Sequence, residues 1–584
     1  MSSKSSQPEI TPVGIDLGTT FSAVAWLDVE GRPSTVRNAE GELTTPSVVF
    51  FDRTAPIVGL EAVEAGIAEP DRLAQFVKRS VGESMFEKKI RGEDLPSEVI
   101  LALILQKLRQ DAELKLGPIR KAVVTVPAFF NEPCRKATMD AGRLAGLDVL
   151  DIINEPTAAA ITYGVEQGFL TRAGESRQKE VILVFDLGGG TFDVTVMQID
   201  GSQYTAIASA GDVYLGGADW DMRIVDYIAS EFQAEFGRDP RDDPSAAQEL
   251  LQKANQAKHS LTAREEISIF FNHDGNRLRR SLTREKFEQL TQDLMERTQL
   301  TLSMVLNEAG MDWDEITRVL LVGGSTRMPA VGRMLEEISG LPVDRSLSPD
   351  EAVAHGAAIY AGLVLKSGSA RDGMTVTNVS SHDLGVLGTE TATGRKRRGV
   401  MIARNSKLPA KKTRGFATAK DNQQSVRVDI VEGGDDSGNN ATKIGTCVVR
   451  DLPPNLPKGT PVEVTFRYAT NGRLQIGARV PAVDRKAELS LNRFAGLSER
   501  EFERWHARIN QGFGDDTIVP PEPPAPPPAE GSKRPIRKLT AADEVFSEQP
   551  APLKKRPATK RRKKASQAPA KEQGEESSPP KSDW

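Results

Sequence analysis

Two stretches of the chain show the same apolar pattern, in which a run of apolar and β-branched residues ends in Asp-Leu-Gly and then resumes. The first is VGIDLGTTFSAVAWLD at 13–28, and the second is VILVFDLGGGTFDVTVMQID at 181–200. A short turn rich in Gly and Thr separates the two apolar runs in each case. The pattern therefore predicts two β-hairpins, and not strands that lead into helices.

Strand-like and helix-like patterns alternate from residue 13 to residue 365, which predicts one α/β domain after a disordered N-terminus at 1–12. The repeated acidic hairpin suggests that this domain arose by internal duplication around a central cleft. Small and polar residues then replace the helical pattern, so we expect an interdomain linker at 366–382.

Short alternating segments separated by Gly, Asn, Asp and Pro occupy residues 383–485 and predict an antiparallel β domain. Asn471-Gly472 is a specific signal for a two-residue hairpin turn. A short helical segment is expected at 486–512. Ser498 and Glu501 have the spacing of a capping box, and three apolar residues share one helical face: Phe502, Trp505 and Ile509.

Residues 513–584 lack the apolar content of a folded core, and we expect a disordered tail. It contains the proline run PPEPPAPPP at 520–528 and the basic run KKRPATKRRKK at 554–564. The basic run is either a solvated extension, a weak electrostatic contact with RNA, ribosomes or an anionic membrane, or a nuclear localisation signal.

Composition narrows the picture only slightly. The formal net charge of −5 over 584 residues gives no global affinity for nucleic acid. Two cysteines, Cys134 and Cys447, cannot form a disulfide framework, which is typical of a reducing compartment. The N-terminus has no apolar run of the signal-peptide type, and no segment is long and apolar enough for a membrane span, so we expect a cytoplasmic protein.

The chemistry that fits the two hairpins is phosphate binding. Glycines without a Cβ allow positive φ and let backbone N–H groups approach a phosphate, and the threonines add hydroxyl donors. These residues are Gly18, Thr19, Thr20, Gly188, Gly189, Gly190 and Thr191. Asp16 and Asp186 would repel a phosphate unless a hard cation lay between them, so the pair predicts magnesium.

A third Gly-rich turn follows the apolar strand pattern in VLLVGGSTRMPAVGRML at 319–335. Gly323 and Gly324 permit close backbone approach, and the planar guanidinium of Arg327 could lie on an adenine ring. One such turn is weak evidence, but three in this order strongly favour a nucleotide site.

These elements, together with five further segments, resemble the ATPase domain of the seventy-kilodalton heat-shock chaperones. Four of the segments are VPAFFNEPCRKATMDAGRLAGL at 126–147, INEPTAAA at 153–160, GDVYLGGADWD at 211–221 and SPDEAVAHGAA at 348–358, and through them the resemblance points to a fifth, LAQFVKRSVG, which contains Lys78. The resemblance runs from Val13 to about Leu365 and more faintly to about Val480. It implies an actin-like ATPase domain of two lobes, ATP or ADP with magnesium, and potassium as a possible further ion.

The same resemblance implies roles for individual residues. Lys78 would reach the γ-phosphate and the attacking water, with Glu155, Asp186, Thr191 and Asp193 completing the catalytic set. Further nucleotide contacts would come from Gly216, Gly217, Asn255, Lys258, Thr262, Ser325 and Asp350. Pro127 and Arg135 would be the switch and the relay that report the nucleotide state to the second domain.

The chain departs from the family at several points. Asn255 stands where the family has a glutamate, which removes a charge-assisted bond to the ribose. The segment between Lys78 and Pro127 is shorter by some tens of residues. The linker offers only Met374 and Val376 in place of consecutive leucines, and the long helical lid is absent.

In the β domain the resemblance implies a hydrophobic peptide pocket formed by Leu384, Val386, Phe416, Val426 and Val428. We therefore expect an ATP-dependent chaperone for unfolded polypeptides, served by a J-domain co-chaperone and a nucleotide-exchange factor. The alternative is a nucleotide-sensing scaffold with a dedicated partner. A sugar kinase or filament protein of the same superfold explains less of the sequence.

Overall fold

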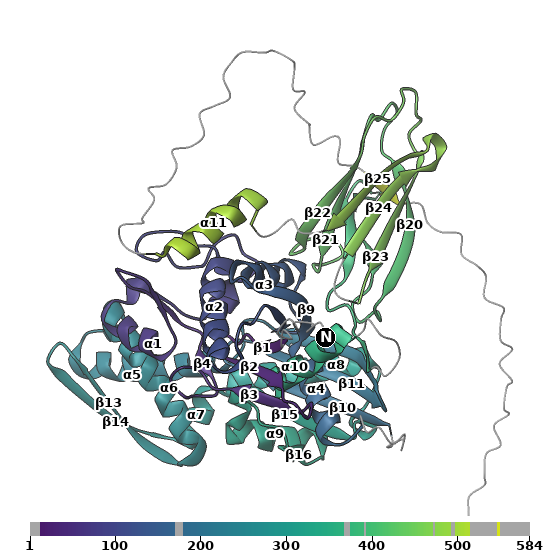
Figure 1. Cartoon of the computed structure of the whole chain (residues 1–584). Coiled ribbons are helices and arrows are strands. Elements are labelled where there is room, and N and C mark those ends of the chain that lie inside the picture. The colour runs from purple at the N-terminus through teal and green to yellow at the C-terminus, as the bar shows by residue number, and fades with distance from the viewer. Residues whose placement is uncertain are drawn as a thin grey trace, which may run out of the picture. The chain divides into compact units, whose positions relative to one another are not determined.

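The computed structural model describes residues 12–169, 179–366, 374–390, 393–470, 474–491, 497–513 and 546–548 (Figure 1). The predictions of a disordered N-terminus, of a hairpin turn at Asn471-Gly472 and of disorder over most of the tail therefore concern residues outside the described ones. Among the described residues, no helix combines the length and apolar character needed to cross a bilayer.

The first sheet contains the first hairpin and defines lobe I. Its strands lie in the order β3 (Pro33–Val36), β2 (Phe21–Leu27), β1 (Val13–Asp16), β8 (Lys121–Val126) and β9 (Asp148–Asn154), and β4 (Thr45–Pro46) pairs with β2. Strands β1 and β2 are antiparallel, with Asp16 opposite Ala23, and β1 is parallel to β8.

The second sheet contains the second hairpin and defines lobe II. Its strands lie in the order β12 (Gln203–Asp212), β11 (Phe192–Asp200), β10 (Glu180–Leu187), β15 (Arg318–Val322) and β16 (Val343–Asp344). Three antiparallel strands are followed by two parallel ones, as in lobe I. Both predicted hairpins are confirmed. The repeated strand order is the structural repeat that the proposed internal duplication would leave.

Two helices lie between the lobes. The cluster of buried residues shared by α4 (Glu155–Glu166) and α10 (Ala352–Lys366) also contains side chains from both sheets. Helix α10 approaches β1 so closely that a Cβ at Gly14 would lie 2.1 Å from the backbone nitrogen of Ala358. The small residues of INEPTAAA and AHGAA therefore allow this tight packing.

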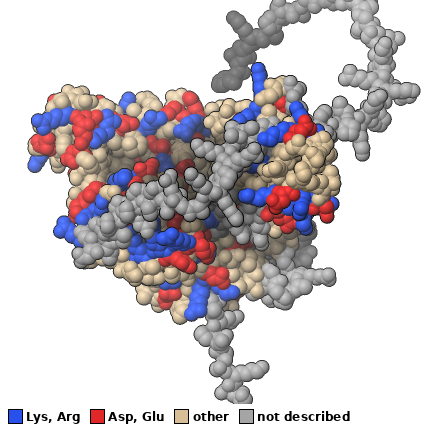
Figure 2. Space-filling model, turned by 90° about the horizontal axis from the view of Figure 1, so that it is seen from above, with Lys and Arg blue, Asp and Glu red and all other residues tan. Residues whose placement is uncertain are grey.

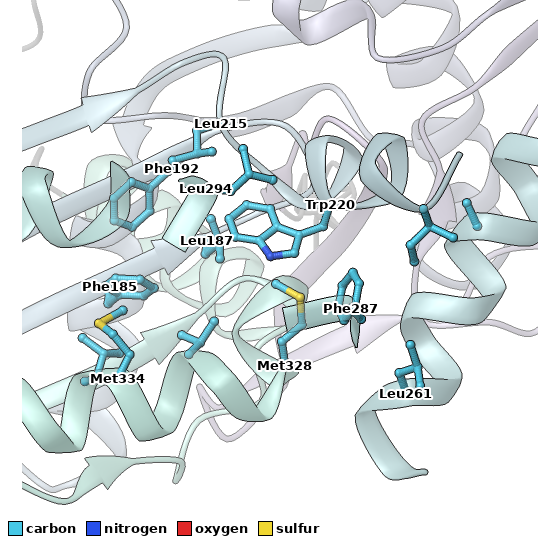
Figure 3. Packing of buried hydrophobic residues seen from close by; sticks show 14 of the residues in the cluster. Phe185, Leu187, Phe192, Leu215, Trp220, Leu261, Phe287, Leu294, Met328 and Met334 are labelled. Atoms are coloured by element: carbon cyan, nitrogen blue, oxygen red, sulfur yellow. The ribbon is translucent and has the colours of Figure 1, made fainter. Parts of the chain in front are cut away.

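Lobe II has a large core on one face of its sheet, where Trp220 packs among Phe287, Leu294 and Met328 (Figure 3). The elements around this core are α5 (Gly217–Phe236), α6 (Pro244–Ala263), β13 (Glu266–His273), β14 (Asn276–Thr283), α7 (Arg284–Leu290), α8 (Gln292–Ala309) and α9 (Pro329–Ser339). The buried aromatic rings fix the position of α5 and α6, which carry candidate nucleotide contacts.

Lobe I is covered by α2 (Ser97–Leu116) and α3 (Glu132–Leu144), and a small sheet of β5 (Val49–Phe51), β6 (Pro56–Val58) and β7 (Leu73–Ala74) adjoins α1 (Leu60–Ala68). Its core also contains Trp505, Ile509 and Phe513 from the far C-terminal side of the β domain. These residues belong to or follow α11 (Glu499–Gln511), whose predicted capping box of Ser498 and Glu501 is confirmed.

The segment expected as a linker is partly a strand. Residues Thr375–Thr377 form β17, which extends the lobe II sheet by pairing in parallel with β12. Met374 and Val376, the expected anchors, pack against the cluster between the lobes. The connection to the β domain is therefore bound along the edge of lobe II.

The β domain is a pair of antiparallel sheets with one shared core. The first has the order β19 (Lys396–Ile402), β18 (Leu384–Thr389), β21 (Val426–Glu432) and β22 (Thr442–Val449). The second has the order β25 (Arg485–Leu491), β24 (Leu474–Val480), β23 (Pro461–Tyr468), β20 (Ala410–Thr418) and β26 (Phe546–Glu548).

Three details differ from the sequence-based boundaries. Strand β25 continues to Leu491, beyond residue 485, because its pairing with β24 runs the full length of both strands. Phe513, the first residue of the expected tail, is fully buried in lobe I. Strand β26 comes from within the expected disordered tail.

Candidate nucleotide site

A cavity of about 460 Å³ opens where the two hairpin turns meet. Most of the predicted site residues line it, although they come from distant parts of the chain. They are Asp16, Gly18, Thr19, Thr20, Lys78, Glu155, Asp186, Gly188, Gly189, Thr191, Asn255, Lys258, Thr262, Gly323, Gly324, Ser325, Arg327 and Asp350. The volume and the polar lining suit a nucleotide with its phosphates.

The turn glycines are needed because the two hairpins press against each other. A Cβ at Gly189 would lie 2.1 Å from Thr20 Oγ1, and one at Gly190 would lie 2.3 Å from the Cγ2 of Thr19. The predicted reason, positive φ, is wrong for the hairpin glycines, none of which has positive φ. It holds for Gly323, where φ is 82°.

Three carboxylates, those of Asp16, Glu155 and Asp186, lie with one lysine at the floor of the cavity, and a fourth, that of Asp193, lies just below it. Lys78 Nζ lies 2.5 Å from Glu155 Oε1, and both side chains are buried. Burial, followed by the charge of Glu155, raises the pKa of Asp16 to about 7 and that of Asp193 to about 7. The same two causes raise the pKa of Asp186 well above its usual value.

This excess of buried negative charge fits a hard cation. Asp16 and Asp186 offer oxygen ligands, and a divalent cation beside them would restore their ionised forms. No group of three or more His, Cys, Asp or Glu side chains in the described part of the chain forms a ready metal cage. The donor set therefore fits a magnesium ion that keeps several waters and also binds phosphate oxygens.

Arg79, next to Lys78, joins the two lobes and was not predicted from the sequence. Its guanidinium donates to the carbonyl of Gly190 at 3.0 Å and forms a bidentate pair with Asp219, at 2.5 and 3.2 Å. Asp219 also accepts from the N–H of Gly216 at the start of α5. The contact links lobe I to the turn of the second hairpin, which belongs to lobe II and is expected to bind phosphate.

Helix α6 forms the wall of the cavity at which we expect the nucleotide base and ribose to lie. Lys258 donates to the carbonyl of Gly217 and to Asp221, both at 2.8 Å, and Asn255 donates to the same Asp221 oxygen at 3.0 Å. Asp221, to which the sequence assigned no role of its own, therefore holds both side chains. An asparagine at 255 satisfies Asp221, whereas a glutamate there would face it with a like charge.

The third turn closes the opposite wall. Arg327 is held by Asp350 through two bonds of 2.7 and 2.8 Å, and Ser325 donates to the carbonyl of Gly188 at 2.9 Å. The guanidinium plane is therefore fixed at the cavity wall, where an adenine could stack.

Four predicted residues do not line the cavity. Gly190, Gly216 and Gly217 lie behind the phosphate-side turn, where the N–H of Gly217 donates to the carbonyl of Gly188 at 2.9 Å. Asp193 lies below it and accepts from the N–H groups of Ala128 and Phe129, at 2.8 and 3.3 Å. Sequence also missed lining residues without an obvious motif signal, including Phe21, Thr44, His259, Met328, Pro349 and Val353.

The segment after Pro127 also contacts the last two residues of the expected linker, directly before β18. The carbonyl of Ala128 accepts from Ser381 Oγ and from Arg135, while His382 Nε2 hydrogen-bonds the carbonyl of Phe129 at 2.8 Å. Arg135 donates as well to Asn154 Oδ1 at 2.9 Å. The proposed switch and relay residues thus belong to one hydrogen-bonded segment that reaches both Asp193 and the end of the expected linker.

A second contact between the domains is a pair of carboxyl groups. The N–H of Glu132 donates to Glu432 at 3.0 Å, and the hydroxyl of Tyr468 donates to the Glu132 carboxylate at 2.7 Å. Burial, reinforced by the charge of Glu132, raises the pKa of Glu432 to about 8. Glu432 therefore holds a proton over most of the neutral range.

The five residues assigned to a peptide pocket are all buried in the β domain. Their exposure is 4% or less: Leu384, Val386, Phe416, Val426 and Val428. They share one core cluster with the remaining strands. The assignment of these residues to a pocket therefore stays a proposal.

The duplicated hairpins and their cavity define a two-lobed nucleotide-binding protein of the actin-like class, joined to a β-sheet domain. Comparison with known proteins specifies the class further. The family model described as "Hsp70 protein" matches residues 12–577, and this chain belongs to that family. It is 38% identical over 535 residues to "Chaperone protein DnaK" of Deinococcus radiodurans, covering 86% of this chain and 82% of that protein. It is a DnaK-type, ATP-binding Hsp70 chaperone.

Proposed function

We propose that ATP hydrolysis in the cavity controls the affinity of the β domain for extended apolar segments of unfolded polypeptides. The observation that carries this proposal is the segment from Ala128 to Phe130. Its N–H groups bind Asp193 beneath the nucleotide cavity, and its carbonyls bind Ser381 and His382, the last two residues of the expected linker, directly before β18. A displacement of the bonds to Asp193 would displace the bonds to Ser381 and His382, because the same short backbone segment makes both. Such a link is what coupled binding requires.

Within this proposal the cavity residues have three different roles: metal binding, phosphate binding and positioning of the attacking water. Asp16 and Asp186 hold hydrated magnesium, which neutralises the phosphate oxygens when bound, and the two Gly-Thr turns cradle the phosphates. Lys78 and Glu155 position the attacking water, with Thr191 and Asp193 beside them. Because the positive charges of Lys78 and of the magnesium ion would stabilise the transferring phosphoryl group most in its transition state, the set favours hydrolysis over mere binding.

Partners and conditions belong to the same proposal. The relative from Deinococcus radiodurans is a DnaK, and a J-domain co-chaperone and a nucleotide-exchange factor are the partners that we propose by analogy. Potassium beside the phosphates is proposed on the family resemblance alone. A cytoplasmic location is supported by two cysteines, Cys134 and Cys447, that are both free.

Contact with RNA, ribosomes or an anionic membrane would depend on the basic run at 554–564, outside the described residues. On the face shown in Figure 2, basic and acidic side chains of the described residues are interspersed, without a broad patch of one sign. This face therefore lends no support to such a contact, and we assign any such binding to the basic run.

The test is the rate of ATP hydrolysis with and without an extended peptide that contains consecutive leucines. We expect the peptide to increase turnover several-fold, and its off-rate to be faster with ATP than with ADP. The complete burial of the five pocket residues is the observation that favours the alternative, a nucleotide-sensing scaffold. Unchanged turnover together with no peptide binding in either nucleotide state would establish that alternative.

A further inference from the structure

Strand β26 adds three residues of the chain's own tail to the open edge of β20. The pairing is antiparallel, with Thr418 opposite Phe546, Ala417 opposite Ser547 and Phe416 opposite Glu548. On its other side β20 pairs with β23 along most of its length, so β26 covers the opposite edge of β20 at its last three residues. It is the terminal strand of this sheet.

The place that β26 occupies is the one assigned above to a peptide ligand. Strand β26 lies beside β18, which carries Leu384 and Val386, as well as beside the end of β20, which carries Phe416. Phe416, Ala417 and Thr418 are all at most 4% exposed. An extended segment that pairs with a free strand edge is the usual mode of β-augmentation, in which backbone bonds supply affinity without demanding one sequence.

The chain is long enough to make this contact within one molecule. Residues 514–545 separate Phe513, which is buried in lobe I, from β26. A connection of this length can span up to roughly 100 Å, and tethers of this kind give effective concentrations on the order of 1 mM. Even a weak ligand, when attached in this way, occupies its site for most of the time.

We propose that the tail segment around Phe546–Glu548 is an internal ligand of the peptide site. It occupies the β20 edge in the free chaperone, and an unfolded polypeptide must displace it. Phe546 is the only phenylalanine after residue 513, in the sequence AADEVFSEQP at 541–550. The inference rests on the proposed function, because it names a resident occupant and a means of regulation for the same site.

Displacement has a calculable effect on outside ligands. If the tethered segment binds with a dissociation constant near 0.1 mM, an effective concentration on the order of 1 mM leaves about one molecule in ten open. The apparent affinity for an outside peptide then falls about tenfold, in proportion to the open fraction. Only segments that bind well, or that are present at high local density, would gain access.

The test removes backbone donors from β26 in the full-length chain. Thr418 donates its N–H to the carbonyl of Thr460 on the β23 side, so Ala417 and its partner Ser547 face each other. The double variant S547P/E548P therefore removes the N–H that Ser547 presents to β20. The matched control is A565P/S566P, which places two prolines elsewhere in the tail. Two fluorescein-labelled probes are used: a heptapeptide with three leucines between arginines, and the decapeptide AADEVFSEQP.

We expect S547P/E548P to bind both probes about tenfold more tightly than the wild type and the A565P/S566P control do. Equal binding of the leucine probe to all three proteins would overturn the internal-ligand inference while leaving peptide binding intact. Failure of the decapeptide to bind S547P/E548P, when the leucine probe binds, would overturn it as well. Absence of binding by either probe to every protein would instead refute the proposed peptide-binding function.

Amide hydrogen exchange gives a readout that needs no outside ligand. The N–H of Ala417 should exchange faster in S547P/E548P than in the wild type and the control, because the N–H of Thr418 next to it donates to the carbonyl of Thr460 and the N–H of Ala417 therefore faces β26. Unchanged exchange would overturn the occupancy of the β20 edge by the tail. Exchange protection that rises with protein concentration would show that the tail comes from a second molecule, which contradicts the intramolecular assignment.

Discussion

Asp193 accepts a hydrogen bond of 2.8 Å from the backbone N–H of Ala128, and thereby ties the floor of the nucleotide cavity to a segment that the end of the expected linker also contacts. The carbonyl of Ala128 faces the other way and accepts from Ser381. One peptide segment therefore carries a nucleotide-side bond and a linker-side bond. Its position can respond to whichever of the two changes.

The first prediction concerns this connection. In Asp193→Asn the amide can accept only through its oxygen, so one of the N–H groups of Ala128 and Phe129 loses its acceptor. We expect peptide stimulation of ATP turnover to fall at least several-fold. The measurement is turnover with and without the leucine peptide, and Asp200→Asn, at the exposed end of the same strand, is the control. Full stimulation in Asp193→Asn would disprove the connection.

The second prediction concerns Lys78. Lys78→Ala should reduce the single-turnover rate of hydrolysis by about 10²-fold or more, because a charge aimed at the γ-phosphate acts chiefly in the transition state. The dissociation constant for ATP should change little, since the turns supply most ground-state contacts, and it also reports that the variant is folded. Lys89→Ala, an exposed lysine of the same lobe, is the control. Retained hydrolysis would remove Lys78 from the mechanism.

The third prediction concerns magnesium. Asp16→Asn and Asp186→Asn each remove one carboxylate from the site of excess negative charge, so each should raise the magnesium concentration needed for half-maximal turnover. A magnesium titration of the ATPase rate measures the shift. Asp350→Asn, which removes a carboxylate paired with Arg327, should leave the magnesium requirement where it is. An unaltered titration in both cavity variants would refute the paired-carboxylate site.

The fourth prediction uses the raised pKa of Glu432. Its pKa rises from 4.5 in the unfolded chain to about 8 in the folded one, mainly by burial. The folded state therefore binds more protons between these values, and its stability falls as pH rises from about 4.5 to about 8 and levels off above that. Glu432→Gln should flatten this fall in the melting temperature.

The matched control is Glu463→Gln, an exposed position on β23. It should keep the wild-type pH dependence of the melting temperature. If Glu432→Gln showed the same decline from pH 6 to pH 9 as the control, the buried carboxyl pair would not be the source of the effect.

The fifth prediction concerns the end of the folded chain. Phe513 is fully buried and its ring lies 5.4 Å from that of Phe51, edge to face. Phe513→Ala should lower the free energy of unfolding by about 3 kcal/mol, as for other buried aromatic truncations. Urea denaturation measures this. A chain ending at Phe513 should still bind ATP and unfold cooperatively in urea, and loss of either property would place a core element beyond residue 513.

Much of the fold was accessible from local pattern. The paired hairpins, their duplication and the α11 capping box depend on residues close in sequence, whose periodicity and turn chemistry are visible directly. Arg79 and Asp219 were not accessible, because their contact joins two lobes across 140 positions of sequence. The hairpin glycines were located correctly for the wrong reason, since a steric limit set by Thr19 and Thr20 appears only when both turns are placed.

The tail shows a different limit. Strand β26 has three residues within a segment rich in proline and charge, and no alternation of apolar and polar residues marks it. It forms a strand because it pairs with the edge of β20, and β20 lies far away in the sequence. Composition therefore predicted disorder for the whole tail and gave no sign of the short strand β26.

Helix α11 also affects the order in which the molecule can be made. Lobe I contains Trp505, Ile509 and Phe513 in its core, although the rest of that lobe lies before residue 155. At about 5–20 residues per second, the ribosome reaches these side chains on the order of tens of seconds after it has made the rest of lobe I. The β domain has left the ribosome by then. This chaperone completes its own first lobe last, with an incomplete apolar core until the final helix arrives.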